Sequence, residues 1–360
     1  MADMFALFAS GDGLTPNYPE VEKLVRDYVQ RCVDHGVTRL IPGGTGGPIL
    51  IEVAHEQNLE VDSYKAVNVY GANKAAYEMS IEYVLPYLGA PEAREILDRH
   101  RPMHAVREYT LNISDTFAEK NRQYWNKTRE GRIDPLPNER VSLSFGFPEV
   151  RQHESDLFIT PHKESKSDGV QMEFVLMNMD KYGVNNYGYE APIIEAFNKQ
   201  TNKNPFDLPN DDRAWLQHRA KYTTEFVRNL RQNLRIESPD ARLTATLIAR
   251  DPDEYLKVFH DWPTWIDEGL IDEFYIWFRT TSDLNEVESQ TKHAAEVVNG
   301  RVPLIAEISC YHPGSFQDPK SLLEAAIRAR GNGADAVGLY RSHAVEQLNL
   351  WSVVEQIRKI

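Results

Sequence analysis

The chain has 360 residues, of which 41% are hydrophobic and 10% aromatic, so it can bury a large core. This composition excludes global disorder and a collagen-like fibre. The formal net charge of −14 at pH 7 opposes attraction to phosphate backbones and anionic membranes, so we expect neither nucleic acid nor a membrane as a partner.

The cysteine content and the N-terminal residues indicate where in or outside the cell the protein is found. The chain contains only Cys32 and Cys310, which excludes a disulfide framework, and Cys32 lies in an amphipathic pattern typical of a core position. The opening MADMFALFASGDG lacks the basic start of a signal peptide, and no run reaches the roughly 18 apolar residues that span a bilayer. We expect a cytoplasmic location for the chain as given, or a secreted or periplasmic one if a leader has been removed.

Short apolar runs alternate with helical patterns along the chain. The expected strands, in order, are Met4 to Ser10, Thr38 to Ile41, Tyr64 to Tyr70, Gly169 to Leu176, Arg242 to Ala249, Glu273 to Phe278, Val302 to Ile308 and Ala336 to Leu339. The expected helices are Pro19 to His35, Ile49 to Leu59, Leu216 to Leu234, Pro252 to Glu268, Leu284 to Val298, Pro319 to Gly331 and Leu350 to Ile357.

Strands separated by helices need crossover connections and therefore form a parallel sheet. Eight such strands predict an α/β fold, a (β/α)8 TIM barrel that occupies residues 1–360 as one domain. A doubly wound sheet is the alternative, but Gly11-Asp12-Gly13 lacks the third glycine of a dinucleotide-binding turn. A barrel needs about 250 residues. We expect the excess to form long insertions after strands 3 and 4, residues 71–165 and 177–215, that wall a substrate cleft.

Two glutamates lie within apolar strands. Glu173 lies within the run QMEFVLMN that ends the fourth strand, and Glu307 lies in LIAEIS of the seventh. Side chains at the C-terminal ends of barrel strands build the active site, so both carboxylates can meet across the barrel mouth. Such a pair suits a glycosidase, in which one carboxyl protonates the leaving oxygen and the other attacks or activates water. Alternatively, each glutamate simply pairs with a barrel arginine such as Arg250 or Arg279.

Other polar and aromatic residues at strand ends are typical of a sugar site, because flat rings stack on sugars while polar groups bond their hydroxyls. The candidates for substrate binding are Asp12, Tyr70, Asn178, Tyr187, Arg250, Trp277, Arg279, Tyr311 and Tyr340.

Other chemistries have weaker support. The chain has eleven histidines but neither H-x-H nor H-E-x-x-H, so we predict no metal, and a site from His312, His343 and Asp12 is the one alternative. No G-x-S-x-G occurs, and no lysine lies at a strand end where a Schiff base could form. We predict no cofactor.

Several segments resemble the bacterial glycosyl hydrolase-like family 10 barrels. These are SLSFGFPEVRQHESDLF followed by DGVQMEFVLMN, then YGYEAPIIEAFNKQTNKNPFDLPNDDRAWLQHRAKYTTEFVRNLRQNL, and the ending with IAEIS and GADAVGLYR. The resemblance covers roughly residues 100–350. It implies a TIM barrel and a glycoside hydrolase that acts on an unidentified glycan, and it maps the acidic position of the fourth strand onto Glu173, where many relatives carry aspartate.

The sequence therefore predicts a glycoside hydrolase with Glu173 as general acid/base and Glu307 as nucleophile or base. On this hypothesis, burial keeps Glu173 protonated near neutrality, while Glu307 stays ionised beside a cation. The alternatives are a noncatalytic carbohydrate-binding barrel and a metal-dependent barrel isomerase or lyase.

Overall fold

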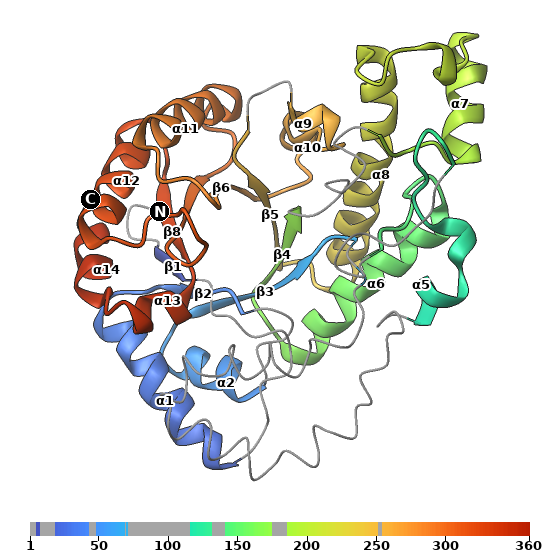
Figure 1. The fold of residues 1–360 in the computed structure, drawn as a ribbon. Helices are drawn as coiled ribbons and strands as arrows, with labels where there is room; N and C mark the ends of the chain where they lie inside the picture. The colour runs from blue at the N-terminus through green and yellow to red at the C-terminus, as the bar shows by residue number, and fades with distance from the viewer. Residues whose placement is uncertain are drawn as a thin grey trace.

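The structure is a computed structural model that describes residues 5–7, 19–42, 48–68, 70, 116–131, 141–174, 186–250 and 254–360. Its strands form a closed parallel barrel in chain order, since β1 also pairs with β8, which confirms the predicted fold (Figure 1). The strands are β1 (Phe5–Leu7), β2 (Arg39–Leu40), β3 (Glu60–Ala66), β4 (Gly169–Phe174), β5 (Arg242–Ile248), β6 (Glu273–Phe278), β7 (Leu304–Ser309) and β8 (Ala336–Tyr340).

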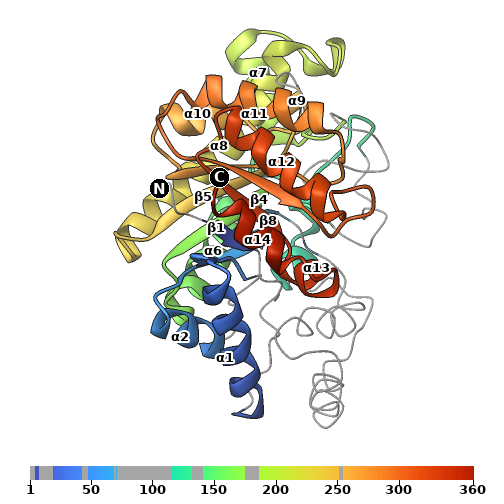
Figure 2. The same ribbon diagram turned by 90° about the vertical axis from the view of Figure 1, so that its left-hand side faces the viewer.

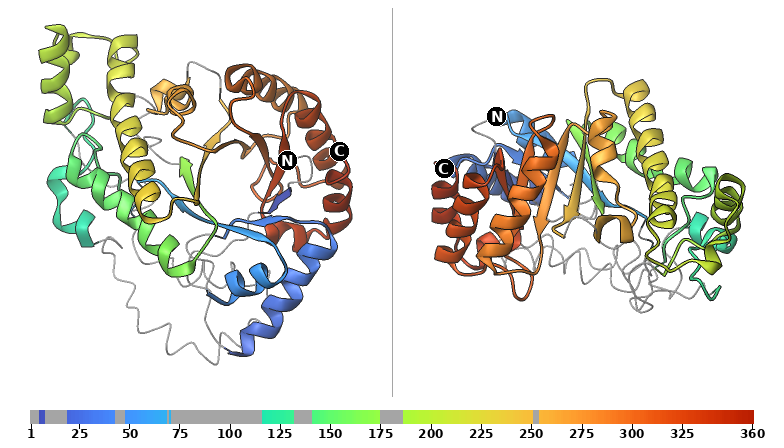
Figure 3. Two further views of the ribbon diagram at one scale, coloured as in Figure 1. Left: turned by 180° about the vertical axis from the view of Figure 1, so that it is seen from behind. Right: turned by 90° about the horizontal axis from the view of Figure 1, so that it is seen from above.

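Helices surround the barrel, as the side and rear views show (Figures 2 and 3). The helices of the described residues are α1 (Pro19–Asp34), α2 (Pro48–Glu56), α5 (Thr116–Lys120), α6 (Pro148–Ser165), α7 (Ala191–Thr201), α8 (Arg213–Glu237), α9 (Glu254–Lys257), α10 (Trp262–Asp267), α11 (Leu284–Val298), α12 (Pro319–Gly331), α13 (Ser342–Gln347) and α14 (Trp351–Ile357), with short 3-10 turns η2 (Arg122–Tyr124) and η3 (Pro205–Asp207). Of these, α5 and α7 lie farther from the barrel (Figure 1). None of the described helices is long and apolar enough to cross a membrane.

Alternation along each strand separates two apolar layers. In β4, the outward side chains of Val170, Met172 and Phe174 join the large core between strands and helices. Gln171 and Glu173 alternate with them and so lie on the interior face. A separate cluster fills the inside of the barrel and consists of Ile41, Tyr275, Trp277, Ile305, Ala336 and Tyr340.

Ion pairs close the N-terminal end of the barrel. Arg39 on β2 lies 2.5 Å from Glu273 on β6 and 3.4 Å from Asp62 on β3, and Arg242 on β5 lies 2.8 Å from Asp62. Arg39, Asp62 and Glu273 are buried. Because these groups compensate one another's charge, the barrel can be polar at this end without leaving a buried charge unpaired.

Most predicted element ends agree with the structure within a few residues, but the third strand was misplaced. It spans Glu60–Ala66 and not Tyr64 to Tyr70. It ends because Asn68 adopts a left-handed conformation, with φ of 56°, and its side chain exchanges hydrogen bonds with the backbone of Leu143. Asparagine tolerates this conformation better than most residues do.

Two helical predictions also need correction. The predicted helix from Pro252 to Glu268 consists of α9 and α10, separated by Phe259 in a left-handed conformation. Residues 148–165, which we assigned to the first insertion, form α6, and α6 packs against β3, β4 and α8 as a helix of the barrel layer. The part of that insertion ahead of α6 therefore ends at residue 147.

Candidate active site

Glu307 lies on the interior face of β7 and is 1% exposed. Its Oε2 accepts a hydrogen bond from Oγ1 of Thr246 on β5, at 3.2 Å. Burial and the nearby charge of Glu173 raise the pKa of Glu307 well above its ordinary value, and the Thr246 hydrogen bond only partly opposes them. Both causes favour the protonated form of this carboxyl group over its ionised form.

Glu173 is the second carboxyl group of the site. It is the penultimate residue of β4, is 8% exposed, and pairs in register with Thr246 of β5 and Ala66 of β3. Its charge acts on Glu307, which shows that the two carboxyl groups are electrostatically coupled although they come from strands three apart. The barrel thus brings the two predicted catalytic residues to one interior region.

Aromatic rings from β6, β7 and β8 pack next to Glu307. Trp277 of β6 pairs in register with Glu307 of β7. Its ring centroid lies 4.7 Å from that of Tyr340. His312 stacks on Tyr340 at 5.3 Å, and Tyr311 lies edge-on to His312 at 5.2 Å. These rings form an apolar wall beside the carboxyl pair, with Tyr311 and His312 half-buried and the other two rings buried.

Two arginines flank this aromatic wall. The guanidinium of Arg279 lies 5.6 Å from the Trp277 ring centroid, and that of Arg341 lies 3.7 Å from the Tyr311 ring. Burial and these two cations lower the pKa of His312 to about 4, so its imidazole is neutral at pH 7. Nδ1 of His312 lies 3.0 Å from the hydroxyl of Ser309, which fixes the orientation of the ring.

The structure does not bring every predicted binding residue into this group. Tyr70 is buried beside α6, where its hydroxyl donates to Glu154. Tyr187 packs with Ala220 and Phe259 in a separate cluster. Arg250 lies near His260, whose pKa its charge helps to lower.

Some predictions fall on positions that the structure does not describe. Asp12 and Asn178 lie outside the described residues, and the side chain of His343 is also not described. Among the described residues no cluster of three or more His, Cys, Asp or Glu side chains could hold a metal. The alternative metal site from His312, His343 and Asp12 is therefore not tested.

Two expectations about Glu307 were wrong. We expected a cation beside it and an ionised carboxylate, but its described hydrogen-bond partner is the neutral Thr246 and its described charged neighbour is Glu173. The reason is that the arginines flank the aromatic wall instead. Thr246 and Gln171 were not predicted from the sequence. Their signal was alternation, because Thr244 and Thr246 occupy every second position of RLTATLIA and so share one face of β5.

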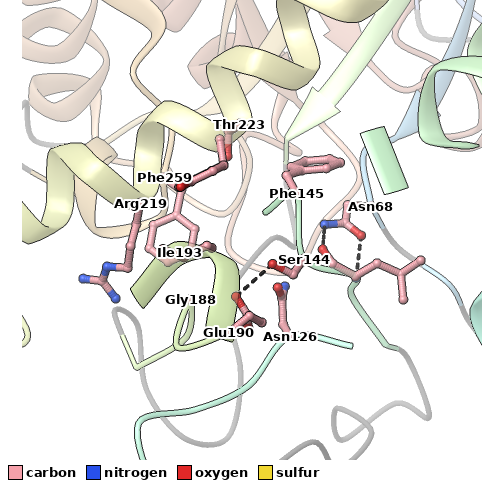
Figure 4. A pocket seen from close by; sticks show the side chains of 12 residues that line it. Asn68, Asn126, Ser144, Phe145, Gly188, Glu190, Ile193, Arg219, Thr223 and Phe259 are labelled. Carbon is pink, nitrogen blue, oxygen red and sulfur yellow. Dashed lines mark hydrogen bonds between the residues drawn. The ribbon is translucent and has the colours of Figure 1, made fainter. Parts of the chain in front are cut away.

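Another buried carboxyl group, that of Glu190, lies outside the barrel interior. Glu190, just before α7, accepts a hydrogen bond from the backbone N–H of Lys127 at 2.5 Å. It accepts a second one from the hydroxyl of Ser144 at 2.8 Å (Figure 4). Burial raises the pKa of Glu190 to about 7 although both bonds lower it. It lines a cavity of about 20 Å³ together with Asn68, Arg219 and other residues, and this volume suits a single water molecule.

The closed parallel barrel carries two carboxyl groups toward the C-terminal ends of β4 and β7, beside an aromatic wall, and TIM-barrel enzymes build their active sites at this end of the barrel. Residues 103–318, more than half of the chain, match the family described as Glycosyl hydrolase-like 10. The chain belongs to this family.

Solved structures with the same fold include several glycoside hydrolases. The glycoside hydrolase domain of PgaB (BpsB) from Bordetella bronchiseptica is 12% identical, with a TM-score of 0.63 and 98% of both chains covered. The catalytic domain of β-amylase from Paenibacillus polymyxa is 10% identical, with a TM-score of 0.55, and the match covers 95% of this chain and 94% of that one. At these identities the likeness concerns the fold. No match is found among curated proteins.

Proposed function

We propose that the protein is a glycoside hydrolase that cleaves a glycosidic bond in an oligo- or polysaccharide, with Glu173 as general acid/base and Glu307 as nucleophile or base. The observation that carries this proposal is the coupling of two buried glutamates on β4 and β7. Family membership and fold neighbours that are glycoside hydrolases support the same reaction class.

The charge coupling implies that the pair holds one proton near neutral pH, because two buried carboxylates do not ionise together readily. In the free site, burial and the charge of Glu173 favour this proton on Glu307. The proposed roles need it on Glu173 when substrate binds. Positive charge that develops at the anomeric carbon favours an ionised Glu307, and protonation of Glu173 removes the charge that opposes that ionisation.

We further propose that the aromatic wall binds the sugar. Trp277, Tyr311 and Tyr340 would supply apolar faces, and Arg279 would donate to hydroxyl groups. Asp12, Asn178 and Arg250 remain proposed contacts, and residues 71–147 and 177–215 are proposed walls of the cleft. Because Tyr70 and Tyr187 pack elsewhere, we expect them to support these walls from behind.

The roles of the two glutamates are separable by leaving-group dependence. We expect Glu307→Gln to abolish turnover of every substrate. Glu173→Gln should reduce hydrolysis of native glycans by about 10²–10⁴-fold but spare aryl glycosides with activated leaving groups, which need little protonation. The measurement is kcat/KM for each variant on both substrate types, after a screen of aryl glycosides and native polysaccharides.

Glu190→Gln is the matched control, since Glu190 is an equally buried glutamate with a raised pKa outside the barrel interior. Its activity should stay close to that of the unmodified protein. The reverse pattern, in which Glu307→Gln spares activated substrates, would assign the acid role to Glu307. Glycan binding without turnover in the unmodified protein would instead indicate a noncatalytic carbohydrate-binding barrel.

A further inference from the structure

Glu307 is held from inside the barrel by a two-residue chain of hydrogen bonds. Thr246 on β5 bonds Oε2 of Glu307 at 3.2 Å, and Nε2 of Gln171 on β4 in turn donates to Oγ1 of Thr246. Gln171 is 0% exposed, and Thr246 and Glu307 are each 1% exposed. Among the residues that the structure describes, Thr246 is the hydrogen-bond partner of the Glu307 carboxyl group.

We propose that Thr246, oriented by Gln171, is a positioning residue that fixes Oε2 of Glu307 as a hydrogen-bond acceptor and so leaves Oε1 as the oxygen that reacts. This inference rests on the proposed function, because it assumes that Glu307 is the group that attacks or activates water. It concerns two neutral side chains that would not themselves touch the substrate.

The donors and acceptors of these side chains determine the direction of the two hydrogen bonds. A threonine hydroxyl carries one proton and can also accept hydrogen bonds. Because the amide N–H of Gln171 occupies an acceptor position of Thr246, the hydroxyl proton is directed to Glu307. A carboxylate that accepts this bond is stabilised relative to its protonated form.

The stabilisation matters because the other neighbours of Glu307 act in the opposite sense. Burial and the charge of Glu173 both favour the protonated form of Glu307, and the hydrogen bond of Thr246 favours the ionised form. The ring of Trp277, next in register on β6, is neutral, and Gly338, next in register on β8, has no side chain. Thr246 is thus the described group that supports ionisation of Glu307.

Strand β5 offers a matched control for a test of this positioning role. Thr244 lies two residues before Thr246 on the same face of β5 and is also fully buried, and its hydroxyl has no hydrogen-bond partner among the described residues. Thr246→Val and Thr244→Val therefore remove the same hydroxyl from the same strand, but only the first removes a bond to Glu307. Thr246→Ser keeps that bond and serves as the rescue variant.

The direct readout is the titration of Glu307, followed by pH-dependent infrared difference spectroscopy, with Glu307→Gln identifying its band. A hydrogen bond to a charged group shifts the ionisation equilibrium of that group by about one order of magnitude or more. We expect Thr246→Val to raise the pKa of Glu307 by about one pH unit and to lower kcat about tenfold, with a smaller change in KM. Thr246→Ser and Thr244→Val should titrate as the unmodified protein does.

Gln171 is tested through its dependence on Thr246. Gln171→Leu should shift the titration in the same direction by a smaller amount, and it should add nothing in the Thr246→Val background, since its effect passes through Thr246. Thermal unfolding of each variant shows whether it is folded at the temperature of the titration.

The outcomes separate this inference from the proposed function. An unchanged Glu307 titration in folded Thr246→Val, or an equal shift in Thr244→Val, overturns the positioning role whatever the activity is. A shifted titration in a protein that hydrolyses no glycan supports the contact with Glu307 and overturns the glycosidase proposal.

Discussion

Trp277 shows how one buried residue can serve both the core and the proposed site. Its ring is 1% exposed and packs on Tyr340 inside the barrel, and its residue pairs in register with Glu307. From the sequence we predicted that this ring binds the sugar. The structure places the ring deeper, with the half-buried Tyr311 and His312 beside it, so that a sugar would meet the edge of an aromatic cluster and not a single exposed ring.

A substitution of Trp277 tests this part of the site. We expect Trp277→Phe to raise KM for glycan about tenfold, because it shrinks the wall beside Glu307 while it keeps an aromatic ring. Trp262→Phe is the control, since Trp262 is equally buried but stacks on Phe274 in the layer between barrel and helices. Steady-state kinetics of both variants give the comparison, and equal changes in KM would place the sugar site elsewhere.

Glu190 connects separate segments of the fold through hydrogen bonds. Its carboxyl group joins the segment of residues 116–131, through the backbone of Lys127, to the segment of residues 141–147, through Ser144, directly at the start of α7. Arg219 of α8 lies in the same cavity lining and donates to the backbone of Tyr187. These contacts fasten the residues after β3 to the helices α7 and α8.

The raised pKa of Glu190 predicts how stability depends on pH. In the folded protein Glu190 holds its proton up to about pH 7, whereas its ordinary pKa is 4.5. The folded state therefore binds more protons than the unfolded state in this window, and the contribution of Glu190 to stability falls as pH rises from about 4.5 to 7. The loss is about 3 kcal/mol.

Glu190→Gln should remove this dependence, because an amide can accept from Lys127 and donate to Ser144 without a charge. We expect the melting temperature of this variant to match that of the unmodified protein near pH 4.5 and to exceed it near pH 8. Calorimetric melting curves across this range test the prediction, and a parallel pH dependence in both proteins would contradict it.

At the scale of the whole molecule, the barrel has two polar ends with different chemistry. At the N-terminal end Arg39, Asp62, Arg242 and Glu273 compensate one another in ion pairs. In the C-terminal half, the charge of Glu173 opposes the ionisation of Glu307. Charge pairing stabilises the first end, whereas the second end holds two acidic side chains together without a described cation beside Glu307, and perturbed ionisation of this kind is common at functional sites.

We expect the ion pairs at the N-terminal end of the barrel to affect the free energy of unfolding but not catalysis. Arg39→Met should reduce the free energy of unfolding by about 3–5 kcal/mol, because it leaves buried carboxylates without their cation. Arg26→Met, which breaks an exposed pair with Glu56, should change it little. Urea unfolding measures both, and kcat of Arg39→Met should stay unchanged at temperatures where it is folded. A loss in Arg39→Met no larger than in Arg26→Met would contradict the role of this network.

The sequence by itself determined the barrel and the strands that carry the two glutamates, because hydrophobic periodicity and strand alternation are local properties. The helix from Leu284 to Val298 and the strand from Glu273 to Phe278 were predicted to the residue. Only the tertiary structure decided the contacts of Glu307. Its bond to Thr246, its coupling to Glu173 and the separation of Tyr70 and Tyr187 from the aromatic wall all join residues that are far apart in the chain. Burial and distance set these interactions, and both exist only once the barrel has closed.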